Sequence, residues 1–225
     1  ATDIADTTNL TDDYLNTQVS RAESLYVTVD ASMVDTIALF SMDGQELVLT
    51  LTDGLDTIYT ETISLQYEEY IDIWGYFYDE FSFRQDYYAS IPMTLSGSLT
   101  VQINNPGVDA KLGMLILGTN KYLGDTAVEH TAGIVDWSYR ETDESGNTTM
   151  VPGYWAKRLE AEVIVPISQI DQAIRKLTAI RGVPTLWIGA GAKESMLIYG
   201  FYREFEVLYE YADQVYISLT LEGLI

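Results

Sequence analysis

The hydrophobic and polar positions in the first half of the chain alternate in short runs that end at turn sequences. Residues 47–52 alternate leucine with valine or threonine, and this run lies between Asp43-Gly44 and Asp53-Gly54. Alternation bounded by Asp-Gly is typical of β-hairpin strands. A run rich in β-branched residues follows at 57–65 and is expected to form the next strand.

Two further runs complete a first module. Residues 99–103 alternate apolar with polar side chains, and Asn105-Pro106-Gly107 then predicts the end of that strand. Residues 113–118 are continuously apolar over a length that suits a strand buried on both faces. Together these runs predict a β-sandwich over 24–118. The polar residues 1–23 have no sustained period and are expected to form an arm that is ordered only against a neighbour.

The second half of the chain changes rhythm after the segment 119–133, which we interpret as a loop. Segments 133–141 and 148–165 flank the polar turn sequence 143–147, and this arrangement predicts a long hairpin. Apolar side chains face one way along the return strand, and two glutamates face the other way.

The segment 168–181 has the 3.6-residue periodicity of an amphipathic helix. Ser168 and Asp171 have the spacing of a capping box, and Gly182 and Pro184 are expected to end the helix. We expect the apolar stripe of this helix to pack against a sheet. The stripe consists of Ile170, Ala173, Ile174, Leu177 and Ile180.

Three strands are predicted after the helix, over 185–188, 195–209 and 214–222, with a bulge at Gly200. The second module, 119–225, therefore has the order ββαβββ. We interpret it as a β-sandwich or split barrel with one packed helix. The predicted fold class of the whole chain is mainly β.

The composition is strongly acidic, with 34 Asp and Glu against 12 Lys and Arg and a net charge of −22. Such a surface repels phosphate backbones, so sequence-specific binding to nucleic acid is not expected. The charge is uneven, because residues 1–118 carry 19 acidic and 3 basic side chains, and residues 119–225 carry 15 and 9. The acidic surface serves either solubility or a wall that repels DNA or collects cations.

The sequence also bears on membrane insertion, secretion and disulfide cross-links. No apolar run approaches the ~20 residues of a membrane span, so no membrane insertion is expected. Residues 1–6 have neither the basic start nor the apolar stretch of a signal peptide. The chain contains no cysteine, which excludes disulfides and thiolate metal sites.

No motif points to catalysis. The one histidine, His130, lies in the predicted loop, whereas a Ser–His–Asp arrangement needs a base held by a third group. Segment 189–195 lacks the glycine spacing and the following helix of a phosphate loop, so we interpret it as a hairpin turn. Loop carboxylates could bind a calcium ion, but no spacing matches a dedicated calcium-binding loop. We therefore expect a structural or binding protein with no cofactor and no metal site, not an enzyme.

The most unusual segment is 67–88, in which ten of the 22 residues are aromatic and six are acidic. Aromatic rings beside carboxylates suit three roles: packing over the sandwich, contact between subunits, or stacking on sugars. The acidic residues argue against a platform for nucleic acid, which needs a basic groove. The candidate interface or ligand contacts are Trp74, Tyr76, Tyr78, Tyr87 and Tyr88.

Two resemblances to known families follow from particular runs. The first module resembles galactose-binding-like jelly-roll domains through the runs 34–40, 47–54 and 113–118. The second resembles a family of tailed-bacteriophage virion proteins, and its strand and helix order is similar to tail-tube and distal-tail ring domains. The residues that carry it are Ile134-Val135-Asp136-Trp137-Ser138-Tyr139-Arg140-Glu141-Thr142-Asp143, Gly146-Asn147, Val151, Ala156-Lys157-Arg158, Leu186-Trp187-Ile188-Gly189 and Tyr199-Gly200-Phe201-Tyr202.

The second resemblance implies a structural component of a bacteriophage virion, assembled in the host cytoplasm and placed in a tail, tail tip or baseplate. Its partners would be other copies of itself, in a ring or other homo-oligomer, and other virion proteins. A tail channel lined with carboxylates lets DNA slide without sticking. The alternative function is a carbohydrate-binding adhesion module that uses the segment 74–88 to bind a host surface glycan.

Overall fold

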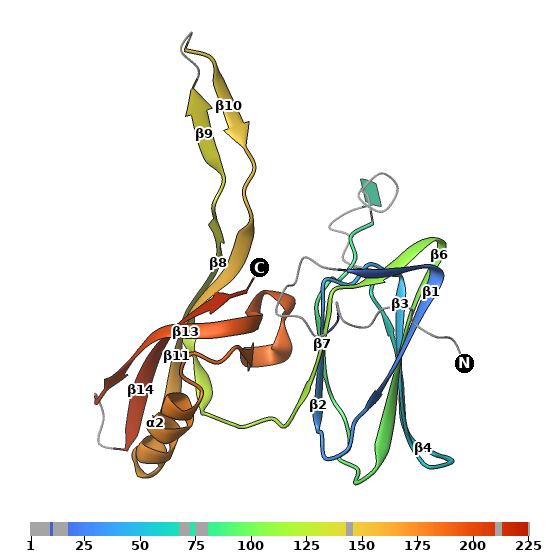
Figure 1. The fold of residues 1–225 in the computed structure, drawn as a ribbon. Coiled ribbons are helices and arrows are strands. Elements are labelled where there is room, and N and C mark those ends of the chain that lie inside the picture. The colour runs from blue at the N-terminus through green and yellow to red at the C-terminus, as the bar shows by residue number, and fades with distance from the viewer. Residues whose placement is uncertain are drawn as a thin grey trace. The chain divides into compact units, whose positions relative to one another are not determined.

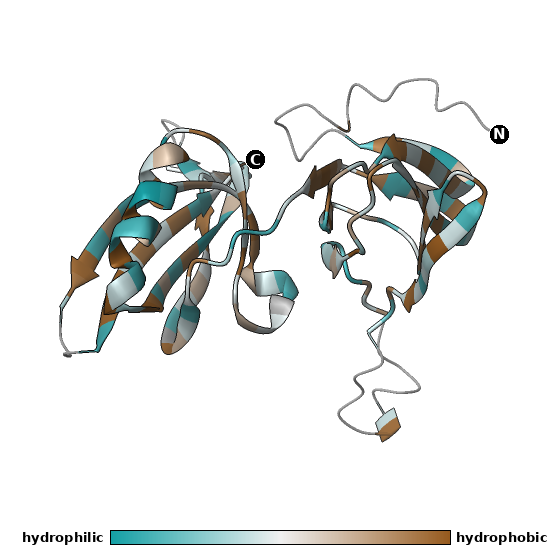
Figure 2. Cartoon of the chain, turned by 90° about the horizontal axis from the view of Figure 1, so that it is seen from below, coloured by the Kyte–Doolittle hydropathy of each residue, from teal (hydrophilic) through white to brown (hydrophobic). Residues whose placement is uncertain are grey.

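The structure is a computed structural model that describes residues 10, 18–67, 73–74, 81–142, 146–209 and 213–224. The chain is mainly β, as predicted, and divides into two compact units, Ala1–Asn120 and Lys121–Ile225 (Figure 1). Hydrophobic and hydrophilic residues alternate along the strands of both units (Figure 2). This alternation is the basis of the core in each unit.

The first unit is a sandwich of two antiparallel sheets. One sheet has the order β1-β6-β3-β4 and the other β5-β2-β7. The first sheet consists of β1 (Val19–Asp30), β6 (Gly97–Leu112), β3 (Glu46–Asp53) and β4 (Asp56–Ser64). The second consists of β5 (Tyr87–Ser90), β2 (Thr36–Phe40) and β7 (Met114–Gly118).

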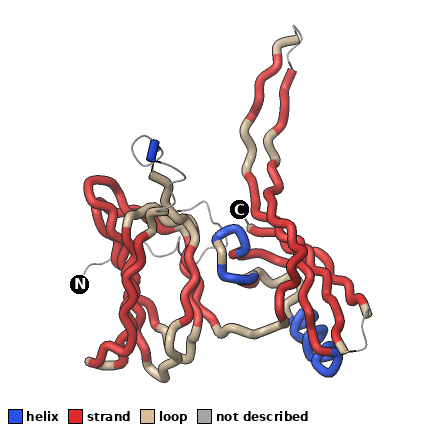
Figure 3. The backbone as a smooth tube through the Cα atoms, turned by 180° about the vertical axis from the view of Figure 1, so that it is seen from behind, coloured by secondary structure: helices blue, strands red, loops and turns tan. Residues whose placement is uncertain are grey.

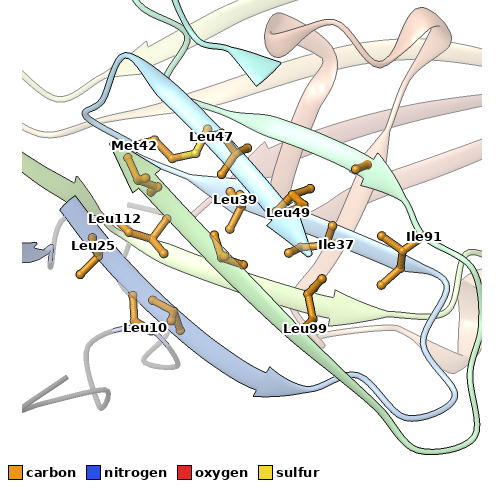
Figure 4. Packing of buried hydrophobic residues seen from close by; sticks show 14 of the residues in the cluster. Leu10, Leu25, Ile37, Leu39, Met42, Leu47, Leu49, Ile91, Leu99 and Leu112 are labelled. Atoms are coloured by element: carbon orange, nitrogen blue, oxygen red, sulfur yellow. The ribbon is translucent and has the colours of Figure 1, made fainter. Parts of the chain in front are cut away.

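The core of the first unit lies between these sheets (Figure 4). Leucines 47, 49 and 51 of β3 all point into it, while the residues between them face outward, so the predicted alternation is confirmed. The β3–β4 hairpin turns where Asp53 pairs with Asp56, as the Asp-Gly sequence predicts. Leu39 of β2 belongs to the same core from the facing sheet, and Ile103 of β6 lies beside Leu47 in the same sheet.

Two predictions for the first unit were wrong at their edges. Strand β6 does not end at Asn105-Pro106-Gly107, because these residues loop out of the β1–β6 pairing, which resumes where Ala22 pairs with Asp109. The predicted arm 1–23 is also too long, since β1 begins at Val19, and Leu10 is buried in the core of its own chain. The start of β1 was not predicted because this strand lies at the sheet edge and buries only one face, so polar residues occupy its other face.

The second unit contains a five-stranded antiparallel sheet of order β12-β13-β14-β11-β8. Helix α2 (Ile170–Ala179) packs on this sheet (Figure 3) and follows a short 3-10 turn at Ile167–Gln169. The predicted apolar stripe is confirmed, with Ile170, Ala173 and Leu177 buried in the core. The strands are β8 (Asp125–Asp136), β11 (Trp155–Pro166), β12 (Thr185–Ile188), β13 (Leu197–Leu208) and β14 (Gln214–Gly223).

Three local predictions for the second unit need correction. Residues 125–133 belong to β8, not to a loop, so His130 lies on a strand. The capping box does not form: neither the 3-10 turn nor α2 has a side-chain hydrogen bond at its N-terminus. The bulge in β13 lies between Tyr202 and Glu204, not at Gly200. Glycine at position 200 is explained by close contact instead, because a Cβ there would lie 2.0 Å from the Glu222 carbonyl oxygen.

The segment between β12 and β13 is a tight connection, as predicted. Two 3-10 turns, Ala190–Ala192 and Glu194–Met196, join these strands, which pair antiparallel. Gly191 takes a left-handed conformation there, with φ of 72°. This connection therefore has the geometry of a hairpin turn and not of a phosphate loop.

Candidate interaction surface

A long hairpin extends from the second unit beyond its sheet. Strands β8 and β11 pair up to Asp136 and Trp155, and β9 (Tyr139–Thr142) and β10 (Thr148–Val151) then pair only with each other. Figures 1 and 3 show β9 and β10 as a two-stranded ribbon that projects from the five-stranded sheet. We call the described residues 134–142 and 146–155 the hairpin arm.

A hydrogen-bonded joint connects the sheet to the ribbon. The Asp136 carboxylate oxygen Oδ1 accepts hydrogen bonds from the Ser138 backbone N–H at 2.8 Å and from its hydroxyl at 2.7 Å. The Ser138 Oγ in turn accepts from the backbone N–H of Gly153 at 2.9 Å. The Trp137 N–H donates to the Tyr154 carbonyl at 3.0 Å. The joint therefore ties the outgoing strand to the returning strand.

Two residues of this joint are fixed by its geometry. A Cβ on Gly153 would lie 2.4 Å from the carbonyl carbon and oxygen of Trp137, so only glycine fits without a backbone shift. Hydrogen bonds from the side chain and backbone of Ser138 hold the pKa of Asp136 below its ordinary value. Asp136 therefore stays ionised as an acceptor at neutral pH.

The hairpin arm exposes large apolar side chains on both faces. Tyr139 is directly opposite Val151, while Met150 is opposite Arg140 on the other face. Exposed aromatic and apolar groups of this size mark protein interaction surfaces, where tyrosine and tryptophan are enriched among the residues that dominate binding. The exposed set, from 44 to 68% accessible, is Ile134, Trp137, Tyr139, Met150, Tyr154 and Trp155.

The two paired strands of the hairpin arm carry no net charge, although the chain is very acidic. Strand β9 carries Arg140 and Glu141 and β10 carries no charged residue, whereas Asp136 lies at the joint and Asp143 and Glu144 lie between the two strands in the sequence. A second acidic molecule meets less repulsion at these two strands than at a strand with an excess of carboxylates. Apolar side chains and low local charge therefore coincide on one element.

The five aromatic residues predicted as contacts do not form one surface. Trp74 is exposed at 67%, but Tyr76 and Tyr78 lie outside the described residues. Tyr87 and Tyr88 are neighbours on β5, so their side chains point to opposite sides of the sheet. Tyr87 packs against the core of the first unit, and its role there is packing.

The stem of the aromatic segment holds a small polar cluster. The Arg84 guanidinium carbon lies 5.5 Å from the Tyr67 ring centroid and 5.7 Å from that of Tyr87, within the range of cation–π contacts. The Tyr59 hydroxyl donates to the Glu61 carboxylate, and burial followed by this hydrogen bond raises the pKa of Tyr59. Arg84 thus already contacts Tyr87, which was a candidate for ligand contact, and Tyr67 of the same segment.

Outside the arm and this cluster, the structure brings together little that points to chemistry. The part of the chain that is described holds no group of three His, Asp or Glu side chains that could bind a metal ion. His130 is exposed, and its Nδ1 lies 3.4 Å from the Ala127 carbonyl oxygen. None of the described helices is long and apolar enough to cross a membrane.

Two comparisons with known proteins found no match. No protein-family model matches the sequence, and no curated protein shows significant similarity to it. The hairpin arm is therefore interpreted from its own residues.

Proposed function

We propose that this chain is a structural subunit of a bacteriophage virion, placed in a tail or tail tip, and that it works by self-assembly and by docking neighbouring proteins. The observation that carries the proposal is the hairpin arm. An isolated two-stranded ribbon is marginally stable in water. The exposed side chains of Tyr139, Met150 and Tyr154 gain stability only when another surface covers them.

The distribution of charge fits an assembled particle. Carboxylates keep the free subunit soluble, and in an assembly they form a surface to which DNA does not adhere. Strands β9 and β10 carry no net charge, so a second acidic subunit approaches them with less repulsion than it meets at an acidic strand. Among the described residues no catalytic constellation competes with this function.

Sedimentation velocity of the intact chain tests the self-assembly. We expect an oligomer that is lost in the triple variant Tyr139→Ser, Met150→Ser and Tyr154→Ser, whose wild-type side chains are 58 to 68% exposed. A matched control replaces three other exposed apolar residues of the same unit. These are Ile167, Val183 and Leu208, which are 45 to 56% exposed. A monomeric wild type, or equal loss in both triple variants, contradicts the proposal.

The place in a virion needs a separate measurement. Mass spectrometry of purified phage particles should detect the chain in a fixed ratio to other tail proteins. Gold-labelled antibody against the second unit should mark the tail or its tip. Particles that lack the chain contradict the virion function even if the chain forms oligomers.

The exposed Trp74 supports a second candidate, a carbohydrate-binding adhesion module. Exposed tryptophan rings stack on the apolar faces of sugars. A glycan array distinguishes the two functions, because binding that Trp74→Ala abolishes, together with a monomeric chain, favours adhesion. Oligomers without glycan binding favour the structural subunit.

A further inference from the structure

The edge strand of the first unit has no partner on its outer side within the described residues. Strand β4 pairs with β3 alone. From Tyr59 to Ser64 this pairing is regular, with Ser64 opposite Glu46 and Tyr59 opposite Leu51. We propose that this regular part of β4 accepts a strand of the hairpin arm from a second copy of the chain. The inference rests on the proposed self-assembly and names the surface that receives the arm.

A regular edge strand is a template for pairing, because its outward N–H and C=O groups can continue the sheet. Edge strands are usually protected by lysine, proline, a bulge or short length. Residues 59–64 contain no lysine, arginine or proline, and their one charged side chain, Glu61, accepts a hydrogen bond from the Tyr59 hydroxyl. The irregularity of β4 lies before them, between the pairs of Leu51 and Thr52. Thr60 and Thr62 are exposed on its outer face.

The other described sheet edges of the two units are interrupted or short. Strand β1 has an irregular register between Ala22 and Ser24, and the pairing of β8 with β11 is interrupted between Ala161 and Val163. Strands β5, β7 and β12 are only four or five residues long. The regular runs that remain on the interrupted edges are 24–30 of β1 and 130–136 of β8, so these edges are the alternatives against which 59–64 is tested.

The strands of the hairpin arm also lack a neighbour on one side. Strands β9 and β10 pair only with each other, so each has one free edge, and a third strand would stabilise the ribbon. Residues 1–118, which include β4, carry 19 acidic and 3 basic side chains. A nearly neutral strand that contains Arg140 meets this edge with less repulsion than any acidic strand would. The free edge of β4 and a free edge of the arm are both paired when the arm of one copy adds to β4 of another.

The absence of cysteine makes cross-linking a direct test. One population carries Thr60→Cys, and a second carries Glu141→Cys on β9 or Thr149→Cys on β10. These two arm residues are directly opposite each other, so they sample both free edges at one level. The populations are mixed, and a short bis-maleimide is added. The matched control is Thr28→Cys, which lies in the same row across the sheet as Thr60 but on the opposite edge strand, β1.

We expect mixed dimers from Thr60→Cys with one arm variant, at a several-fold higher yield than from Thr28→Cys with the same variant. Equal yields overturn the proposal. Arm-to-arm dimers without any Thr60 product also overturn it, while the self-assembly of the proposed function stands. A chain that stays monomeric in sedimentation and gives no cross-link overturns both.

A second pair of variants tests the edge without cross-linking. Thr62→Lys places a charge on the edge strand, and Thr50→Lys places the same charge on β3, in the interior of the same sheet. We expect Thr62→Lys to lose oligomers and Thr50→Lys to keep them, with both melting as cooperatively as the wild type. Oligomers that survive Thr62→Lys, or that both variants lose equally, contradict a role for β4.

Discussion

The Ser138 hydroxyl oxygen accepts a hydrogen bond from the backbone N–H of Gly153 at 2.9 Å, across the two strands of the hairpin arm. It does so where the β8–β11 pairing has ended at Asp136 and the β9–β10 pairing has not yet begun. A side chain therefore replaces a backbone hydrogen bond at the break in the ladder. We expect the direction of the ribbon to depend on this joint, and the proposed self-assembly requires that direction to be held.

Gly153→Ala should disrupt the joint without unfolding the second unit. Its Cβ would lie 2.4 Å from the backbone of Trp137, a contact that forces the returning strand to shift. We expect weaker oligomers in sedimentation and an unchanged core by thermal melting, because Gly153 lies outside the core of the unit. The control is Gly133→Ala, whose Cβ would meet nothing within 4 Å on the same hairpin. Equal behaviour of the two variants would show that the joint does not orient the arm.

The joint should also respond to acid. Hydrogen bonds from Ser138 lower the pKa of Asp136 from its ordinary value of 3.8. A carboxyl with a depressed folded pKa contributes stability above its unfolded pKa, and this contribution is lost as the pH falls through the folded pKa. We therefore expect the Asp136 carboxyl carbon to titrate below 3.8 in NMR spectra. In Ser138→Ala the midpoint should rise toward that value, and an unchanged midpoint would remove Ser138 as the cause.

The sequence predicts most strands of this fold because apolar alternation reflects burial directly. Residues 47–52 and the helical stripe that ends at Ile180 have the periods of one-sided burial, and both elements are confirmed. The strand over 125–133 was missed because the side chains described there, at 125–128 and 130–133, are exposed or half-buried and show no apolar period. Gly200 was wrongly predicted to be a bulge. Glycine is needed there because the backbone of another strand lies close to it, and a local sequence pattern does not show such a contact.

The candidate surface was less predictable than the fold. Dense aromatic residues drew attention to the segment 67–88, where Tyr87 contributes to packing instead. Trp137 and Tyr139 of the hairpin arm are separated by only one residue, so their spacing alone resembles an ordinary half-buried strand. Only the pairing of β9 with β10 and with no other strand shows that these side chains have nothing to cover them within the described part of the second unit.

Leu177 and Arg175 should differ sharply in their effect on stability. The Leu177 side chain is 1% exposed in the core between α2 and the sheet, so Leu177→Ala should cost about 2–5 kcal/mol of unfolding free energy. Arg175 lies on the exposed face of α2, and Arg175→Ala should change it by less than about 0.5 kcal/mol. Urea denaturation of the isolated variants measures both. Similar losses would mean that α2 buries a different face.

Each unit should fold without the other. The core of the first unit draws all its residues from positions 10–117, and that of the second draws all of its residues from positions 123–221. Fragments 1–120 and 121–225 should therefore each give dispersed NMR spectra and a cooperative thermal transition. A fragment that remains unfolded alone, but folds when the other is added, would show that its core is incomplete.

Self-association should strengthen as salt is added. Copies with a net charge of −22 repel each other, and the range of this repulsion falls from about 30 Å at roughly 0.01 M salt to about 3 Å at roughly 1 M. The apolar contacts of the hairpin arm are not screened by salt, so the attraction persists while the repulsion is lost. Sedimentation velocity across this range should show a rising oligomer fraction for the wild type. The arm triple variant should stay monomeric throughout. Association that weakens with salt would instead indicate an interface of ion pairs, in which Arg140, the one basic residue of the arm, becomes the residue to replace.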